Sequence, residues 1–335
     1  NPAYSADEVE RLQAQRITAI AQEKAQPVGL ALRLLPPILY GEEHAYGVPF
    51  SGTGTEASIS SINSDDLRGF TSVWLRPDNA KLFVVGDTTL DEIVPLLERN
   101  LRRWQAPNTA KPVKNIASVS LPGQDRVILI DKPGSPQSFI LAGHVVPGLG
   151  SAQDLALEAM NDVLGGTFTA RVNMNLREDK GWSYGAQTIL QNARGQRPFL
   201  VYAPVQTDKT GDSLRELVME LNAVKTNRPV TQEEMDKVVA GSTRELPGQF
   251  ETAQAVLNSL VTSDRYGRPL DYPAQLTDAY GALELPDLQA ATNTLQPQAL
   301  VWIIVGDLAQ IRSQVEAVNV APIEVFDEDG NPVAQ

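Results

Sequence analysis

Leu164-Gly-Gly-Thr-Phe-Thr-Ala-Arg-Val-Asn-Met-Asn-Leu-Arg-Glu-Asp-Lys-Gly-Trp-Ser-Tyr184 is the stretch that decides the fold. Apolar side chains recur every four residues from Phe168 onward, which predicts a helix over 168–178. Gly181 ends that helix, and the alternating residues of 182–190 predict a strand. The Gly165-Gly166 pair before the helix predicts a helix–helix turn with positive φ. The chain is therefore expected to pass from a helix into a strand at this corner.

The composition is that of a globular protein. The 335 residues suffice for two domains with their own cores. A net charge of −13 argues against binding to nucleic acid or to an anionic membrane surface. No apolar run approaches the roughly 18 residues that a membrane span needs. Cysteine is absent, so disulfides and thiolate metal sites are excluded.

The second part of the chain groups its expected strands and helices. Strands are expected over 126–130, 137–146, 182–190 and 198–206, and helices over 152–163, 168–178, 210–225, 231–246 and 250–262. Strict alternation of strands and helices is missing. The pattern predicts an α+β fold, with a mainly antiparallel sheet and helices packed on one face.

The first part of the chain predicts mostly helices. Ser5 and Glu8 have the spacing of a capping box at the start of a helix over 5–26, and a second helix follows Pro27. Residues 41–60 look like a loop. Further on, the pattern predicts a helix near 64–75, a turn at 77–79, a buried strand over 81–87 and a helix over 90–103.

An internal repeat relates the two parts. Three motifs recur at an offset of 220 residues: Tyr46-Gly47-Val48-Pro49 and Tyr266-Gly267-Arg268-Pro269, Leu75-Arg76-Pro77 and Leu295-Gln296-Pro297, and Leu82-Phe-Val-Val-Gly-Asp87 and Trp302-Ile-Ile-Val-Gly-Asp307. The constant offset predicts a repeated unit of about 220 residues. On this basis 1–105 form the back half of a truncated first unit, 106–122 a linker, 123–320 a complete second unit and 321–335 a C-terminal tail.

The motifs resemble those of the insulinase/pitrilysin family of zinc metallopeptidases, which carry an inverted His-x-x-Glu-His motif. The matching stretches include Asp131-Lys-Pro-Gly-Ser-Pro-Gln137, Leu164-Gly-Gly-Thr-Phe-Thr-Ala-Arg171, Leu176-Arg-Glu-Asp-Lys-Gly-Trp-Ser-Tyr184-Gly185 and Val230-Thr-Gln-Glu-Glu234. The resemblance implies repeated α+β units of about 220 residues, like those of insulinase and of the mitochondrial processing peptidase.

The zinc ligands that the resemblance implies are absent. The only histidines, His44 and His144, lie a hundred residues apart. Tyr40-Gly-Glu-Glu43-His44 matches just half of the motif, and we favour a structural role for Glu43 and His44 over a metal site. The family's distant Glu ligand corresponds to Ala19, which has no donor atom.

In the second unit, the segment that corresponds to the family's His-x-x-Glu-His helix lacks the zinc ligands as well. Leu155 and Ala159 stand where the resemblance would place histidines, so Glu158 is interpreted as an ordinary helix residue. We therefore expect no metal or cofactor in this chain, and zinc in a partner half.

Arg177 and Tyr184 match an Arg/Tyr pair with which the family's zinc-free unit reaches the active site of the other half. There the pair binds substrate and stabilises the oxyanion of the tetrahedral intermediate, and both side chains are suitable hydrogen-bond donors. The alternative is structural: Arg177 as a cation at a helix C-terminus and Tyr184 as half-buried strand packing.

The resemblance predicts the zinc-free half or partner subunit of such a peptidase, inactive on its own. It would form part of the wall of a chamber that admits peptide substrates, and its partner would be a zinc-bearing half. The alternative is a non-catalytic scaffold or a peptide-binding module of the same fold. Because bacterial relatives of this layout are often exported, we expect a periplasmic protein, with the cytoplasm as the alternative.

Overall fold

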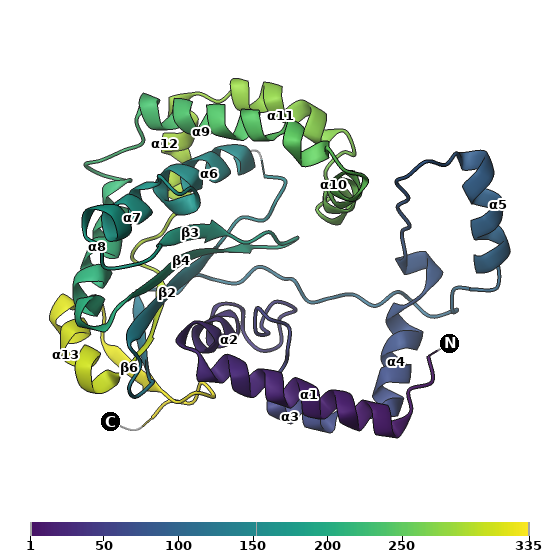
Figure 1. The fold of residues 1–335 in the computed structure, drawn as a ribbon, viewed down its shortest axis with the longest axis horizontal. Coiled ribbons are helices and arrows are strands. Elements are labelled where there is room, and N and C mark those ends of the chain that lie inside the picture. Colours follow the sequence, from purple (N-terminus) through teal and green to yellow (C-terminus); the bar gives the residue numbers. More distant parts are fainter. Residues whose placement is uncertain (1, 152, 334–335) are drawn as a thin grey trace.

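The fold is α+β, with one six-stranded sheet and helices on both of its faces (Figure 1). The structure is a computed structural model, and it describes residues 2–151 and 153–333. The strands are β1 (Arg126–Asp131), β2 (Gln137–Val146), β3 (Gln187–Leu190), β4 (Arg197–Gln206), β5 (Val301–Gly306) and β6 (Ile323–Phe326). They form a single α+β domain, so the predicted α+β class is confirmed, whereas the predicted repeat of the fold is not seen in the described residues.

The sheet is mixed, with the order β3-β4-β2-β5-β1-β6. The pairs β3–β4, β4–β2 and β2–β5 are antiparallel, whereas β1 pairs in parallel with both β5 and β6. The expected antiparallel character therefore holds for one part of the sheet only. Strand β6 lies within 321–335, so the segment expected to be a tail forms one edge of the sheet.

Alternate side chains of the central strands point into two separate cores. Ile140, Ala142 and Trp302 face the core on the side of the later helices. Phe139, Leu141 and Ile303 face the opposite core, which helix α2 covers. This alternation follows from the two-residue period of a strand. The prediction of helices on one face holds for the helices after β2, and the N-terminal part of the chain supplies the cover for the other face.

The later helices pack on the first of these faces or extend beside it. They are α6 (Asp154–Asn161), the π-helical η2 (Asp162–Gly166), α7 (Arg171–Asn173), the π-helical η3 (Met174–Asp179), α8 (Thr210–Ala223), α9 (Gln232–Glu245), α10 (Ala253–Arg265), α11 (Tyr272–Gly281), α12 (Leu285–Ala291) and α13 (Leu308–Val318). Short 3₁₀ turns are η4 (Thr207–Lys209), η5 (Pro247–Phe250) and η6 (Thr292–Thr294). None of the helices in the described ranges combines the length and the apolar content that a membrane span needs.

The N-terminal part forms α1 (Ala6–Ala25), α2 (Pro27–Tyr40), α3 (Glu56–Ser61), α4 (Ser64–Trp74), η1 (Pro77–Asn79) and α5 (Leu90–Leu101). Figure 1 shows α4 and α5 apart from the sheet. The capping box predicted at Ser5 does not form, because its side chain makes no capping hydrogen bond. Glu8 instead accepts hydrogen bonds from Arg11, one turn further along.

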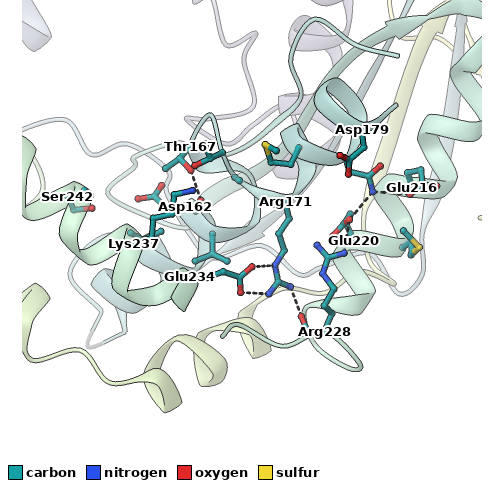
Figure 2. A pocket seen from close by; sticks show the side chains of 18 of the residues that line it. Asp162, Thr167, Arg171, Asp179, Glu216, Glu220, Arg228, Glu234, Lys237 and Ser242 are labelled. Atoms are coloured by element: carbon teal, nitrogen blue, oxygen red, sulfur yellow. Dashed lines mark hydrogen bonds and ion pairs between the residues drawn. The ribbon is translucent and has the colours of Figure 1, made fainter. Parts of the chain in front are cut away.

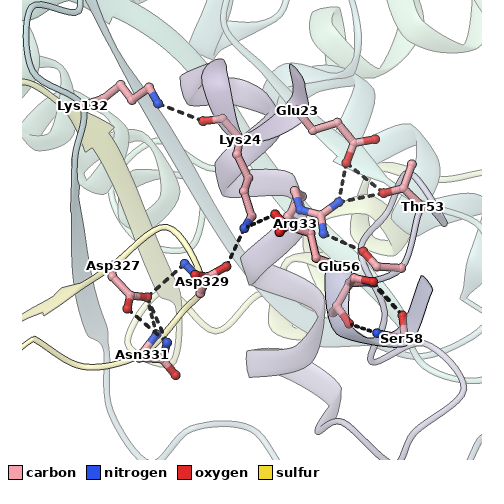
Figure 3. Close-up of polar contacts among 12 residues, drawn as sticks. Glu23, Lys24, Arg33, Thr53, Glu56, Ser58, Lys132, Asp327, Asp329 and Asn331 are labelled. Atoms are coloured by element: carbon pink, nitrogen blue, oxygen red, sulfur yellow. Dashed lines mark hydrogen bonds and ion pairs between the residues drawn. The ribbon is translucent and has the colours of Figure 1, made fainter. Parts of the chain in front are cut away.

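Ion pairs connect α1 to α2, to the start of α3 and to the C-terminal turn (Figure 3). Lys24 at the end of α1 lies between the carboxylates of Glu56, at 2.9 Å, and Asp329. The buried Arg33 of α2 donates to Glu23 and, at 2.7 Å, to Thr53. The first and last segments of the chain thus meet on one side of the sheet.

The strand predicted over 81–87 is not formed, and the described residues before β1 contain no strand at all. Leu82 is 61% exposed and Val84 is 47% exposed. The residues at an offset of 220, Trp302 and Ile304, are fully buried in β5 between two neighbouring strands. A strand needs partners for its backbone groups, and none is present beside Leu82 and Val84. The strands in the described part of the chain therefore form a single sheet.

Two predictions about the opening stretch are also wrong. The strand expected over 182–190 begins only at Gln187, because the N–H of Ala186 donates to the Asn173 side chain instead of a neighbouring strand. Gly165 and Gly166 do not have positive φ, since they continue the helix as η2. The absence of a side chain instead allows Gly165 to pack closely against Thr188, and Gly166 against Asn161 and Asp162.

Gly165→Ala is expected to lower the free energy of unfolding by about 1–3 kcal/mol through overpacking. A Cβ at Gly165 would lie 2.4 Å from the backbone nitrogen of Thr188, so η2 and β3 would have to separate. Urea unfolding measures the change. Gly241→Ala in α9 is the matched control, because its added Cβ meets nothing within 4 Å. It should be neutral or stabilising by up to about 1 kcal/mol, and equal losses in both variants would contradict the packing argument.

Candidate functional site

The corner between η3 and β3 is built by local backbone hydrogen bonds. The N–H of Gly181 donates to the carbonyl of Arg177 at 3.1 Å, and that of Trp182 donates to Leu176 at 2.9 Å. Gly181 has φ of 65°, a left-handed conformation that glycine adopts without strain. The turn therefore fixes the backbone between Arg177 and Tyr184, as the sequence suggests.

Arg177 lies on η3 with its side chain about one-third exposed. Its guanidinium carbon lies over the ring of Phe168, 4.5 Å from the ring centre. A carboxylate oxygen of the adjacent Glu178 lies 3.4 Å away, which makes a weak surface ion pair. The guanidinium is thus positioned by an aromatic ring and keeps donors for a ligand.

Tyr184 is 88% exposed, so the interpretation of it as half-buried strand packing is wrong. The backbone on both sides of it is held. The Ser183 hydroxyl donates to Pro204 and accepts from the N–H of Gly185, and Asn173 accepts from Ala186. A large, polar-tipped side chain on a fixed backbone segment is suited to contact another molecule. Among the described contacts, none joins the side chains of Tyr184 and Arg177.

His44 is a structural residue of the loop after α2. Its Nδ1 accepts from the N–H of Tyr46 at 3.0 Å, so Nε2 carries the proton and donates to Ala117 at 3.1 Å. Its ring stacks on Tyr40 with centroids 4.9 Å apart. Both nitrogens are therefore occupied, and Glu43 next to it is exposed.

His144 lies in the sheet and is almost fully buried. Nδ1 lies 3.0 Å from the carbonyl of Val145, and Nε2 accepts from the N–H of Gln296 at 3.3 Å. Burial, together with the smaller effect of the Lys225 charge, lowers the pKa of His144 from 6.5 to about 4, although the hydrogen bond to the Val145 carbonyl opposes this shift. The ring is therefore a neutral part of the protein core.

His144 is expected to make the protein less stable as the pH falls from 6.5 to 4. In that range the unfolded chain takes up a proton that the folded protein excludes, so the free energy of unfolding drops by up to about 3 kcal/mol. Urea unfolding between pH 8 and pH 4 measures the drop. His144→Gln, which keeps one donor and one acceptor, should lose less stability over the same range. Parallel curves for the two proteins would contradict this prediction.

Glu158 belongs to a network of ion pairs rather than to a metal site. Arg197 lies 3.3 Å from its carboxylate and Arg268 lies 3.7 Å away, and both arginines also pair with Asp154. Burial, and next the charge of Asp154, raises the pKa of Glu158. Within the described ranges, no group of three or more His, Asp or Glu side chains could hold a metal ion.

A cavity of about 740 Å³ opens among η2, η3, α8 and α9, and the sequence did not predict it (Figure 2). Arg171 and Glu234 pair across it, and Arg171 also donates to the carbonyls of Arg228 and Pro229. Burial alone would raise the pKa of Glu234, but hydrogen bonds from Arg171 and Thr231 hold it at about 2.

Arg177 and Tyr184 do not line this cavity. The capping-box spacing of Thr231 and Glu234 was visible in the sequence, but a pairing across 63 residues was not. Because Arg171 and Glu234 satisfy each other, we regard them as a structural pair.

Comparison with known proteins identifies the family. The sequence profile described as the peptidase M16 inactive domain matches residues 61–242, more than half of the chain. The uncharacterized zinc protease YmxG of Bacillus subtilis is 24% identical over 203 residues, which are 61% of this chain and 47% of that protein. Zinc protease PqqE of Helicobacter pylori is 23% identical over 241 residues, 70% of this chain and 53% of that protein. The chain spans about half the length of these curated relatives.

Solved structures share the fold. A peptidase M16 inactive domain from Pseudomonas fluorescens superposes with a TM-score of 0.78 at 21% identity, over 92% of this chain and 72% of that one. The first half of the periplasmic protease PqqL from Escherichia coli superposes with a TM-score of 0.68 at 15% identity, over 97% of this chain and 73% of that one. At such identities the superpositions describe the architecture and not the chemistry.

Proposed function

This chain belongs to the peptidase M16 inactive-domain family, and on that premise we propose that it is the zinc-free half or partner subunit of a zinc peptidase. It forms part of the wall of a peptide-binding chamber, and Arg177 and Tyr184 contact substrate there. Zinc in the other half supplies an activated water for peptide hydrolysis. The N–H groups of Arg177 and the hydroxyl of Tyr184 donate to the oxyanion that forms when the substrate carbonyl is attacked.

The observation that carries the proposal is the exposed position of Tyr184 on a backbone segment held on both sides. Arg177, on the other side of the same turn, is stacked on Phe168 and makes only a weak contact with Glu178. Neither side chain is needed for the core. Both are hydrogen-bond donors of the kind that stabilise developing negative charge.

We also propose that residues 1–105 are the back half of a first unit, whose sheet another polypeptide segment completes. Exposed apolar side chains support this. They include Phe70, Leu75, Leu82, Val84, Leu90 and Leu96. Helix α5 has no buried residue, whereas α13, the helix after the corresponding strand, packs on α8. The missing cover is therefore a set of strands and helices like β1, β2 and α8.

A pair of matched substitutions tests this arrangement. In the isolated chain, Val84→Asp should change the free energy of unfolding by less than about 0.5 kcal/mol, because the site is already exposed. Ile304→Asp, at the corresponding buried position, should cost more than about 4 kcal/mol, since it buries an unpaired charge. In the complete assembly, Val84→Asp should become strongly disruptive as well. Urea unfolding measures the free energy of unfolding of each variant, in the isolated chain and in the assembly. A Val84→Asp variant that is as stable in the assembly as in the isolated chain would contradict the proposal.

We propose peptides as the substrates and the periplasm as the location, in line with the fold shared with the periplasmic protease PqqL. A fusion to a reporter that is active only after export tests the location.

The activity is tested by purifying this chain alone and mixed with a zinc-bearing half that carries His-x-x-Glu-His. The chain alone should bind no stoichiometric zinc and cleave no peptide, and the mixture should cleave peptides in a chelator-sensitive manner. Zinc-dependent cleavage by the chain alone would overturn the proposal. A mixture whose activity does not depend on Arg177 or Tyr184 would favour a non-catalytic scaffold.

A further inference from the structure

Phe168 is an exposed aromatic residue that neither core explains. Its side chain is 63% exposed, and it belongs to neither of the two buried clusters on the faces of the sheet. Its ring lies under the guanidinium of Arg177, 4.5 Å from centroid to Cζ. The contact with Arg177 is therefore the feature that accounts for an exposed aromatic ring at this position.

Stacking on an aromatic face suits an arginine that must bind an anion. The five N–H donors of a guanidinium lie in its plane, so a ring against one face leaves the edges free for hydrogen bonds. An ion pair would instead use those donors and neutralise the charge. The nearest carboxylate, that of Glu178, is 3.4 Å away on the neighbouring residue and does not fix the group strongly.

The backbone of Phe168 is itself held by a buried amide. Asn173 Nδ2 donates to the carbonyl of Phe168 at 2.6 Å, and Asn173 Oδ1 accepts from the N–H of Ala186 at 3.1 Å. Ala186 follows Tyr184 by two residues. One side chain therefore joins the loop that carries Phe168 to the segment that carries Tyr184.

We propose that Phe168 is a positioning residue for Arg177, and that Asn173 fixes the Phe168 loop relative to the Tyr184 segment. The aromatic ring restricts the position of the Arg177 guanidinium and leaves its N–H donors available. The Asn173 amide fixes the distance between the segments that carry the donors of Arg177 and Tyr184. This inference rests on the proposed function, because it describes how the Arg/Tyr pair is held ready for substrate.

The test is a double-mutant cycle in the assembly with a zinc-bearing half. Phe168→Leu keeps an apolar side chain but removes the π face, and should lower kcat/KM for a peptide by about tenfold. Phe168→Trp should restore activity, since tryptophan offers the best cation-binding face. In an Arg177→Ala background, Phe168→Leu should have little further effect. Full additivity of the two substitutions would overturn the inference.

A second readout needs only this chain. In the NMR spectrum, the Arg177 side-chain protons should show an upfield ring-current shift that Phe168→Leu removes and Phe168→Trp retains. The free energy of unfolding should stay nearly constant, because Phe168 is exposed. Arg177 resonances that are the same with and without the ring would overturn the inference. If Arg177→Ala leaves activity intact while the resonances do shift, the proposed function fails and the positioning role stands.

Discussion

Arg177→Ala and Tyr184→Phe, each in the assembly with a zinc-bearing half, are expected to lower kcat/KM for peptide cleavage by about 10²–10³-fold, the usual cost of losing one oxyanion donor. Most of the loss should fall on kcat, because the donors act on charge that develops in the transition state. Tyr184→Phe removes a single oxygen from an exposed side chain, so the folded structure should be unaffected. Steady-state kinetics on a fluorogenic peptide measures both parameters.

The matched control is Arg215→Ala, which removes an exposed arginine that pairs with Asp212 on α8. It should leave both kinetic parameters nearly unchanged. If Arg177→Ala and Tyr184→Phe also support full activity, the pair takes no part in catalysis and the chain is better described as a scaffold. A rise in KM with kcat unchanged would assign the pair to substrate binding alone.

Arg197→Met is expected to lower the free energy of unfolding by about 3–5 kcal/mol. Arg197 is 0% exposed on β4 and pairs with Asp154 and Glu158 of α6. Methionine fills much of the space but leaves the two carboxylates with Arg268 as the one remaining basic partner among the described residues. Urea unfolding at pH 7 measures the loss.

Arg126→Met is the control for Arg197→Met. It breaks a partly exposed pair with Glu324 at the edge of the sheet and should cost less than about 1 kcal/mol. The loss for Arg197→Met should also shrink in mild acid, because burial raises the pKa of Glu158 and its unpaired charge is then removed by protonation. Equal losses in the two variants would show that the buried network contributes no more than a surface pair.

The sequence predicted those elements whose cause lies within a few residues. Strands β1, β2 and β4 were predicted to within a residue, because their apolar runs and flanking turns are local features. The segment 81–87 has the same kind of run and forms no strand, because pairing depends on neighbours that its own composition cannot supply. Strand β6 was missed because it is only four residues long, three of them half-buried, which leaves a weak pattern.

The candidate site divides in the same way. Arg177, Tyr184 and the turn at Gly181 lie within one short stretch, residues 164–184, so local sequence features indicated all three. The contact of Phe168 with Arg177 and the hydrogen bond from Ala186 to Asn173 depend on the tertiary arrangement of helix and loop. Neither contact follows from the spacing of the residues in the sequence. The pairing of Arg171 with Glu234 depends on a tertiary approach of the same kind.

The uncovered run Leu82-Phe-Val-Val85 has a consequence for the chain during synthesis and storage. Four apolar residues with high strand propensity and no proline are the type of segment that nucleates aggregation when exposed. Lys81 and Asp87 flank the run as charged gatekeepers, which slow such association without preventing it. If another polypeptide segment covers this run, as proposed above, the chain without that segment should be the more aggregation-prone form.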